Sequence, residues 1–167
     1  IMSKRVAVTK KGEIEIINYE VPQIDSDLLE IKTLLCTIKH GTQFRAFKGN
    51  SLDYTEPFDK GMLLHLPGSK KPSFPYIFGD VGIGIVEKVG PDCTNIKVGD
   101  IVWGYMKLQE INVISEASIY KMKNYSENFL LFDPAVVALG AVKMSKLSIG
   151  DNSLIIGLGA IGQIAAR

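Results

Sequence analysis

The sequence predicts a mostly β domain followed by the first β-α unit of an α/β domain. In the first part of the chain, short runs rich in Val, Ile and Thr alternate with polar residues, as in half-buried strands. A helix-like stretch follows at about 134–147, and 153–167 reads as an apolar first strand, a glycine-rich turn and the beginning of a helix. We therefore expect a first domain at 1–150, which includes the connecting helix, and the opening of a second domain at 151–167.

The expected strands begin near the N-terminus. In Val6-Ala7-Val8 the two valines share a face, and after a turn at Gly12 the segment 13–16 alternates polar and apolar residues. A longer strand-like run covers 28–38, and 78–90 is a Val- and Ile-rich strand interrupted by glycines. Two antiparallel strands and a longer third favour a barrel or a sandwich over a helical bundle. Further short strands are expected at 101–104, 110–114 and 118–122.

Two other stretches of the first domain are expected to be helical or irregular. Residues 43–48 can form a short helix that Gly49 stops, whereas 51–75 is rich in Pro and Gly and reads as a long loop over a cleft. Asp133 is placed to cap the connecting helix, and Pro134 suits its first turn.

Composition and charge exclude several classes of protein. Of the 167 residues 46% are hydrophobic, and 19 basic against 18 acidic residues leave a net charge of +1. This balance indicates no surface for nucleic acid or for an anionic membrane. No apolar run is long enough to span a bilayer, and no apolar segment follows the N-terminus as in a secretory signal. With Cys36 and Cys93 expected as free thiols in a reducing compartment, we expect a cytoplasmic protein.

The glycine-rich turn carries the clearest chemical signal, because its glycines follow an apolar run with the spacing G-x-G-x-x-G. The first glycine lets the chain turn, the second lets a pyrophosphate approach the backbone, and the third lets a helix pack closely. We therefore expect the turn to bind NAD or NADP through Gly157, Leu158, Gly159, Ala160, Ile161 and Gly162. The alternative is an ordinary buried β-α turn. The acidic residue expected roughly 20 positions further on, which would distinguish NAD from NADP, is not in the sequence.

Several motifs together resemble those of the medium-chain dehydrogenase/reductase superfamily, and the resemblance covers nearly the whole chain. Gly41-Thr42 with Lys48-Gly49 resembles the family's CG[ST]D…KG segment. The strand at 78–90 resembles LGHExxGxVxxVG, and 98–102 is similar to VGDRV. Asp133-Pro134-Ala135 falls where polyol and sugar members have EPL. The set is specific, although each motif alone is weak.

The resemblance implies a GroES-like barrel followed by the truncated start of a Rossmann domain. It also implies an NAD(P)-dependent oxidoreductase that transfers a hydride between nicotinamide and an alcohol, polyol, sugar or carbonyl compound. We expect a small-molecule substrate and, for the complete protein, a homo-oligomer. The alternative is a truncated or degenerate GroES-like module without catalysis that binds a ligand or a partner. A reading frame that continues past Arg167 would favour the enzyme.

The resemblance brings His40, Asp80 and Asp133 to the positions of the family's metal ligands. One imidazole and two carboxylates can bind zinc or a harder divalent ion. The family's orienting carboxylates, however, are replaced by Val81 and Gln43. This change favours a metal-free cleft in which His40 and Asp80 hydrogen-bond each other or water. No cysteine follows position 93, so a structural zinc is not expected.

Without zinc, another group must polarise the substrate and handle one proton. The resemblance places Thr42 where zinc-dependent members have the hydroxyl that begins a proton relay; its alternative role is to close the turn after Gly41. An imidazole such as that of His40 can act as a general acid or base near neutral pH. We therefore expect His40 and Thr42 to be the catalytic pair. Tyr54 is a further candidate donor, and Arg45 is a candidate for binding an anion or else a surface residue.

Overall fold

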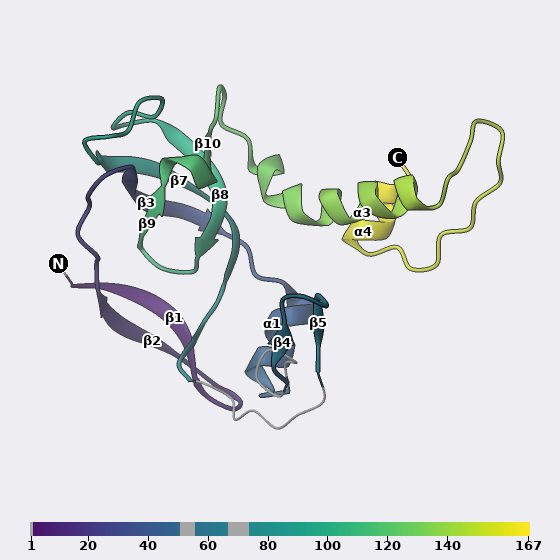
Figure 1. Cartoon of the computed structure of the whole chain (residues 1–167), viewed down its shortest axis with the longest axis horizontal. Coiled ribbons are helices and arrows are strands. Elements are labelled where there is room, and N and C mark those ends of the chain that lie inside the picture. Colours follow the sequence, from purple (N-terminus) through teal and green to yellow (C-terminus); the bar gives the residue numbers. More distant parts are fainter. Residues whose placement is uncertain (1, 51–55, 67–73) are drawn as a thin grey trace. The chain divides into compact units, whose positions relative to one another are not determined.

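The computed structural model describes residues 2–50, 56–66 and 74–167. The chain forms two compact units, Ile1–Tyr125 and Ser126–Arg167 (Figure 1). The first is rich in strands and the second in helices. The connecting helix and the glycine-rich turn both belong to the second of these units. The sequence pattern, in contrast, assigns the helix to the β-rich domain. The domain boundary at residue 150 stays a prediction.

The three-stranded sheet of the first unit has the order β2-β1-β6, and its pairs are antiparallel. β1 (Met2–Lys10) and β2 (Glu13–Glu20) form a hairpin where the sequence predicts two strands and a turn. Gly12 in that turn has a φ of +80°, a conformation that residues with a Cβ rarely adopt. β6 (Tyr76–Ile77) is short and pairs with the other edge of β1.

The five-stranded sheet has the order β10-β8-β7-β3-β9 and curls into half a barrel (Figure 1). Its strands are β3 (Leu28–Cys36), β7 (Gly79–Val89), β8 (Ile101–Lys107), β9 (Ile111–Ser115) and β10 (Ile119–Lys121). All their pairs are antiparallel, and a 3-10 turn, η1 (Glu116–Ser118), connects β9 to β10. The mostly β first part of the predicted fold is confirmed.

The two sheets are joined at the turn between β8 and β9. The amide of Val6 donates to the carbonyl oxygen of Leu108 at 3.0 Å, and the amide of Glu110 donates to that of Lys4 at 3.0 Å. The five-stranded sheet carries the hydrophobic core, whose buried members are Leu29, Ile31, Val86, Ile96, Val102, Met106 and Ile119. Because burial of one large apolar side chain contributes about 1.5–3 kcal/mol, this cluster holds the sheet in its curled form.

Two elements of the first unit lie outside these sheets. α1 (His40–Phe47) is the expected short helix, and it begins three residues before the predicted start at 43. The prediction of an unbroken loop at 51–75 is wrong, because β4 (Phe58–Asp59) and β5 (Leu64–His65) form a small hairpin. The Asp59 carboxylate accepts two backbone amides at 2.8 Å and so closes the turn of this hairpin. Tyr54 lies outside the described residues.

The second unit is mostly helical. A 3-10 turn, η2 (Glu127–Leu131), leads into α3 (Phe132–Met144), and α4 (Ala160–Ala165) packs against α3. The predicted strand before the glycine-rich turn is not formed, and its side chains Leu154 and Ile156 are exposed. A strand needs a neighbour for its backbone hydrogen bonds, and the described part of this unit offers none. Among the described residues, no helix has both the length and the apolar character needed to cross a bilayer.

Candidate active site

The candidate active site of the first unit lies where the first turn of α1 meets the beginning of β7. The side-chain amide of Gln43 donates a hydrogen bond to the backbone oxygen of Gly79, which holds the helix against the strand. Directly before the helix, the Lys39 ammonium lies 3.3 Å from the Asp80 carboxylate. The structure therefore brings the start of α1, whose first residue is His40, to Asp80 on a distant part of the chain.

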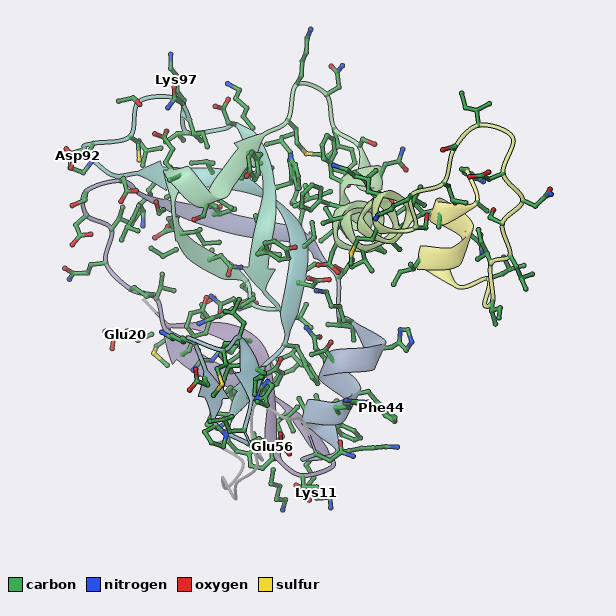
Figure 2. The ribbon with its side chains drawn as sticks, turned by 45° about the vertical axis from the view of Figure 1, so that its right-hand side comes forward. Lys11, Glu20, Phe44, Glu56, Asp92 and Lys97 are labelled. Carbon is green, nitrogen blue, oxygen red and sulfur yellow. The ribbon has the colours of Figure 1, made fainter. Side chains whose placement is uncertain are left out.

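The sequence of α1 sets both ends of the helix. Lys39 has an extended backbone, with φ −86° and ψ 114°, and stands at the N-cap. Gly49 has a φ of +67° and donates its amide to the carbonyl oxygen of Ala46 at 2.9 Å, which ends the helix. Gln43 and Ala46 lie one turn apart and form the buried face, whereas Phe44, labelled in Figure 2, is exposed. Burial of Gln43 thus anchors the first turn.

The beginning of β7 approaches β8 closely because Gly79 has no side chain. A Cβ at this position would lie less than 3.0 Å from the backbone of β8. On the other side of Asp80, the Thr37 hydroxyl donates to the backbone oxygen of Val81 at 3.0 Å. This bond holds the connection between β3 and α1 against the same strand. The backbone is therefore fixed on both sides of Asp80.

Asp80 is a buried carboxylate with 7% of its surface exposed. Burial of an unpaired carboxylate is costly, and an adjacent ammonium offsets part of that cost. Lys39 supplies the ammonium, and 38% of its side chain is exposed, so it reaches from the buried carboxylate to the surface. The same ammonium lies 5.9 Å from the centre of the Tyr105 ring. The pair thus places a positive charge beside α1 in a defined position.

Cys36 ends β3 next to this pair. Its thiol donates to the backbone oxygen of Met106 at 3.6 Å, and burial raises the pKa of the thiol above its ordinary value. The backbone amide of Asp80 lowers that pKa by a smaller amount. A thiol with a raised pKa stays protonated at neutral pH and is a poor nucleophile. Cys36 and Cys93 are both free thiols, as predicted.

The predicted site residues are distributed over both units. His40 and Thr42 lie on the first turn of α1 and are exposed, and Asp133 lies on the first turn of α3 in the second unit. Their roles as catalytic groups and ligands stay predictions. In the described part of the chain, no three side chains of His, Cys, Asp or Glu are grouped so as to hold a metal ion. The donors of the first unit do not fit a zinc site, because the Lys39 ammonium already pairs with Asp80.

Lys39 is the residue of this site that the sequence prediction missed. Its signal is a pair of features: a carboxylate, Asp80, where the family has a ligand histidine, and a lysine directly before His40. A buried carboxylate is rarely found without a partner, so a nearby basic residue is a reasonable candidate. Only the tertiary structure shows that these two side chains are in contact.

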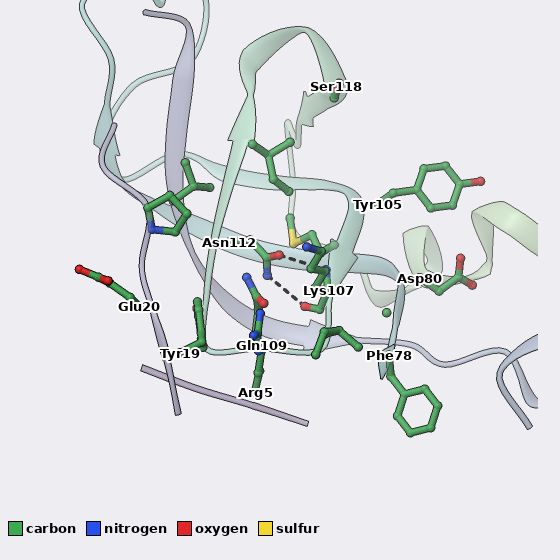
Figure 3. Close-up of a pocket in the computed structure, with 16 residues that line it drawn as sticks. Arg5, Tyr19, Glu20, Phe78, Asp80, Tyr105, Lys107, Gln109, Asn112 and Ser118 are labelled. Atoms are coloured by element: carbon green, nitrogen blue, oxygen red, sulfur yellow. Dashed lines mark hydrogen bonds between the residues drawn. The ribbon is translucent and has the colours of Figure 1, made fainter. Parts of the chain in front are cut away.

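A pocket of about 610 Å³ opens between the two sheets of the first unit (Figure 3). Arg5, Gln109 and Asn112 line its middle, and Asp80 contributes to one side with its carboxylate turned away from them (Figure 3). The side-chain oxygen of Asn112 accepts a hydrogen bond from the backbone amide of Lys107 at 3.0 Å, and its side-chain nitrogen donates to the Lys107 carbonyl oxygen at 3.0 Å. These two bonds fix this wall of the pocket. None of the described residues of the expected loop lines this pocket.

In the second unit, the three glycines of the glycine-rich turn have different surroundings. Gly157 has a φ of +94°, which favours glycine. A Cβ on Gly162 would collide with the backbone oxygen of Gly157, so the helix packs directly on the turn. A Cβ on Gly159 would meet nothing within 4 Å, so the space beside that backbone is open. The side-chain amide of Gln163 donates to the carbonyl oxygen of Leu158 at 2.8 Å and braces the turn.

Comparison with known proteins connects this geometry to a class of enzymes, although no family model matches the chain. The chain is 28% identical over 174 residues to D-guloside 3-dehydrogenase of Escherichia coli strain K12. The alignment covers 98% of this chain and 50% of that protein. It is similar in structure to 2R,3R-butanediol dehydrogenase of Bacillus subtilis, with a TM-score of 0.73 and 24% identity over 99% of this chain and 53% of that one. It is also similar to CAD of Helicobacter pylori complexed with NADP(H), with a TM-score of 0.71 and 16% identity over 99% and 55% of the two chains.

These neighbours are alcohol-dehydrogenase-like oxidoreductases, and the curled half-barrel of the first unit fits their GroES-like domain. The mostly β, GroES-like part of the predicted fold class and the predicted resemblance to the medium-chain dehydrogenase/reductase superfamily are therefore confirmed. The chain spans about half the length of the curated relatives it matches.

Proposed function

We propose that the complete protein is an NAD(P)-dependent oxidoreductase of the medium-chain dehydrogenase type. It transfers a hydride between nicotinamide and an alcohol, polyol, sugar or carbonyl compound. The observation that carries the proposal is the glycine-rich turn, whose open backbone at Gly159 leaves room for a pyrophosphate. The relatives support it, because one is named as a dehydrogenase of a D-guloside and a structural neighbour was solved with NADP(H).

The turn would hold the cofactor through its backbone. α4 begins at Ala160, so the N–H groups of the turn and of the first helical residues are the donors for a pyrophosphate. The residues that would form this cradle are Gly157, Leu158, Gly159, Ala160, Ile161 and Gly162. When bound, the nicotinamide supplies the hydride or accepts it, and the protein contributes binding and orientation.

The first unit would handle the proton of the substrate. Oxidation of an alcohol removes a hydride from carbon and a proton from the hydroxyl group. We assign that proton to His40 and Thr42, which are both exposed on the first turn of α1. A neutral imidazole can accept a proton near neutral pH, and a threonine hydroxyl can relay it.

The experiment that tests the function uses the protein expressed from its complete reading frame. Titration with NADH and with NADPH, followed by nucleotide fluorescence, measures binding of each cofactor. Initial rates with a D-guloside, butane-2,3-diol, simple alcohols and the corresponding ketones then define the substrate class. We expect micromolar binding of at least one cofactor and turnover of at least one compound. Failure to bind either cofactor at millimolar concentration would contradict the proposal.

The same preparation separates the enzyme from the alternative. A protein that binds small molecules and ignores both cofactors is the GroES-like module without catalysis. Light scattering on the sample tests the further proposal that the complete protein is a homo-oligomer.

A further inference from the structure

We propose that the Lys39–Asp80 ion pair stands in the place of a catalytic metal ion and that the Lys39 ammonium hydrogen-bonds the reacting oxygen of the substrate. This inference rests on the proposed oxidoreductase function and adds to its site a residue that the resemblance does not supply. It names Lys39 as a catalytic residue and Asp80 as the residue that positions it.

The ion pair engages the carboxylate that the resemblance assigns to a metal ligand. The resemblance brings Asp80 to a metal-ligand position, and in the structure an oxygen of this carboxylate lies 3.3 Å from the Lys39 ammonium. The Asp80 carboxylate is buried, with 7% of its surface exposed. Two cations that share one buried carboxylate would repel each other strongly at such short range. The lysine and a metal ion are therefore alternatives at this position.

The surroundings hold the ammonium in place before any substrate binds. Lys39 is the N-cap of α1, and the first turn of that helix is tied to β7 by the hydrogen bond from Gln43 to Gly79. Asp80 follows Gly79 directly, so the two partners are attached to a common backbone support. A donor fixed in this way stabilises a developing charge without the cost of reorganising. With 38% of its side chain exposed, Lys39 also remains accessible.

The chemistry needs no group beyond those already proposed. In oxidation, the alcohol carbon would give a hydride to the oxidised nicotinamide and the hydroxyl would give its proton to His40, which would leave a carbon–oxygen double bond. Negative charge gathers on the oxygen as its proton leaves. The Lys39 ammonium keeps its own protons and stabilises that charge through a hydrogen bond. Reduction of a ketone reverses each transfer.

The test compares Lys39→Met with Lys32→Met in the complete protein. Lys32 is the matched control, because its ammonium lies 3.9 Å from Glu87 in an exposed pair on the same sheet. Loss of a single fixed donor to a developing oxyanion lowers kcat by about 100-fold or more, and we expect that loss for Lys39→Met. The dissociation constant of the cofactor should change by less than about twofold, and Lys32→Met should match the wild type in both measurements.

Two further variants separate catalysis from folding. Lys39→Arg keeps the positive charge and should recover part of the kcat that Lys39→Met loses. If Lys39 had only a structural role, Lys39→Met would instead lower the unfolding midpoint. Asp80→Asn keeps the shape of the side chain and removes its charge, so kcat should fall with Lys39 still present. This variant also tests the pair if Lys39→Met does not fold.

Two results would overturn the inference. One is a kcat for Lys39→Met within about threefold of the wild type, which is far below the effect of a fixed oxyanion donor. The other is one tightly bound zinc per wild-type subunit with activity that a chelator removes. A wild type that binds neither NADH nor NADPH contradicts the proposed function itself, so the two failures are distinguishable.

Discussion

The glycines of β7 and Gly159 in the turn before α4 serve different purposes. In β7 a Cβ on Gly79, Gly82 or Gly84 would lie less than 3.0 Å from atoms of the neighbouring strands. These glycines let three strands approach one another closely. Beside Gly159 the same Cβ would meet nothing within 4 Å. Glycine therefore removes a clash within the fold in β7, as it also does at Gly162, whereas at Gly159 it keeps a surface open.

The comparison shows that glycine spacing alone does not distinguish packing from binding. The pattern G-x-G occurs both at 82–84 and at 157–159. What differs is the surroundings of each missing Cβ, which depend on strands far away in the sequence. The two segments should respond differently to an added methyl group, and alanine variants at individual glycines test this difference.

The largest effect is expected for Gly84→Ala in β7. The added Cβ would collide with the Ile31 side chain and with the backbone of Lys32 on β3. Overpacking of this kind costs about 1–3 kcal/mol, and more where backbone must move, so the first unit should be strongly destabilised. Urea unfolding followed by Trp103 fluorescence measures the change. A variant as stable as the wild type would show that β7 does not need its glycines.

The second effect is expected at Gly159, and it concerns binding. Alanine there meets open space, so the free energy of unfolding should change by less than about 0.5 kcal/mol. Cofactor affinity of the complete protein should fall by about tenfold or more, because the methyl group would stand where the pyrophosphate approaches. Nucleotide fluorescence measures the affinity. Unchanged affinity would place the phosphates elsewhere.

A third prediction concerns the loop that follows β7. Glu116 accepts backbone amides of residues 94–96 at 2.7–3.1 Å, and these bonds lower the pKa of its carboxyl group below the ordinary value of 4.5. Figure 2 shows this loop, marked by Asp92 and Lys97, at the opposite end of the first unit from Phe44 on α1. Its stability contribution should thus be independent of the candidate active site.

The sign of the pH dependence follows from the lowered pKa. The ionised Glu116 stabilises the folded state above the unfolded-state pKa, and that contribution is lost as pH falls through the folded-state value. Glu116→Gln should therefore lower the urea midpoint at neutral pH and approach the wild-type midpoint in acid. Glu87→Gln, in an exposed pair, is the control with little expected change. Equal differences at both pH values would contradict this role of the carboxylate.

The smallest effect, and the only gain, is expected for Gly140→Ala in α3. A Cβ at Gly140 would meet nothing within 4 Å, and the residue lies inside the helix. Alanine is favoured over glycine in a helix interior by about 0.8–1.0 kcal/mol, so α3 should become slightly more stable. Thermal unfolding followed by circular dichroism measures the shift. A loss of stability would mean that this glycine, unlike Gly159, serves close packing.

Part of the candidate site was predictable and part was not. Asp80, His40 and the six residues of the glycine-rich turn follow from motifs, because each motif is a short stretch of sequence with a characteristic spacing. Lys39 was missed, because its importance comes from its contact with Asp80, which lies on β7 far away in the sequence. The strand expected before the turn did not form, because a strand depends on neighbours that its own sequence does not contain.

The sequence by itself determined the local elements of this protein: the period-two strands, the turn at Gly12, the short α1 and the glycine-rich turn. These depend on alternation, on glycine conformations and on helix ends, which act between residues close in the chain. Only the tertiary structure decided that β3 pairs with β7 and β9, and that Lys39 neutralises Asp80. These depend on burial and on charge pairing between residues far apart in the chain, and no local pattern records which distant residues meet.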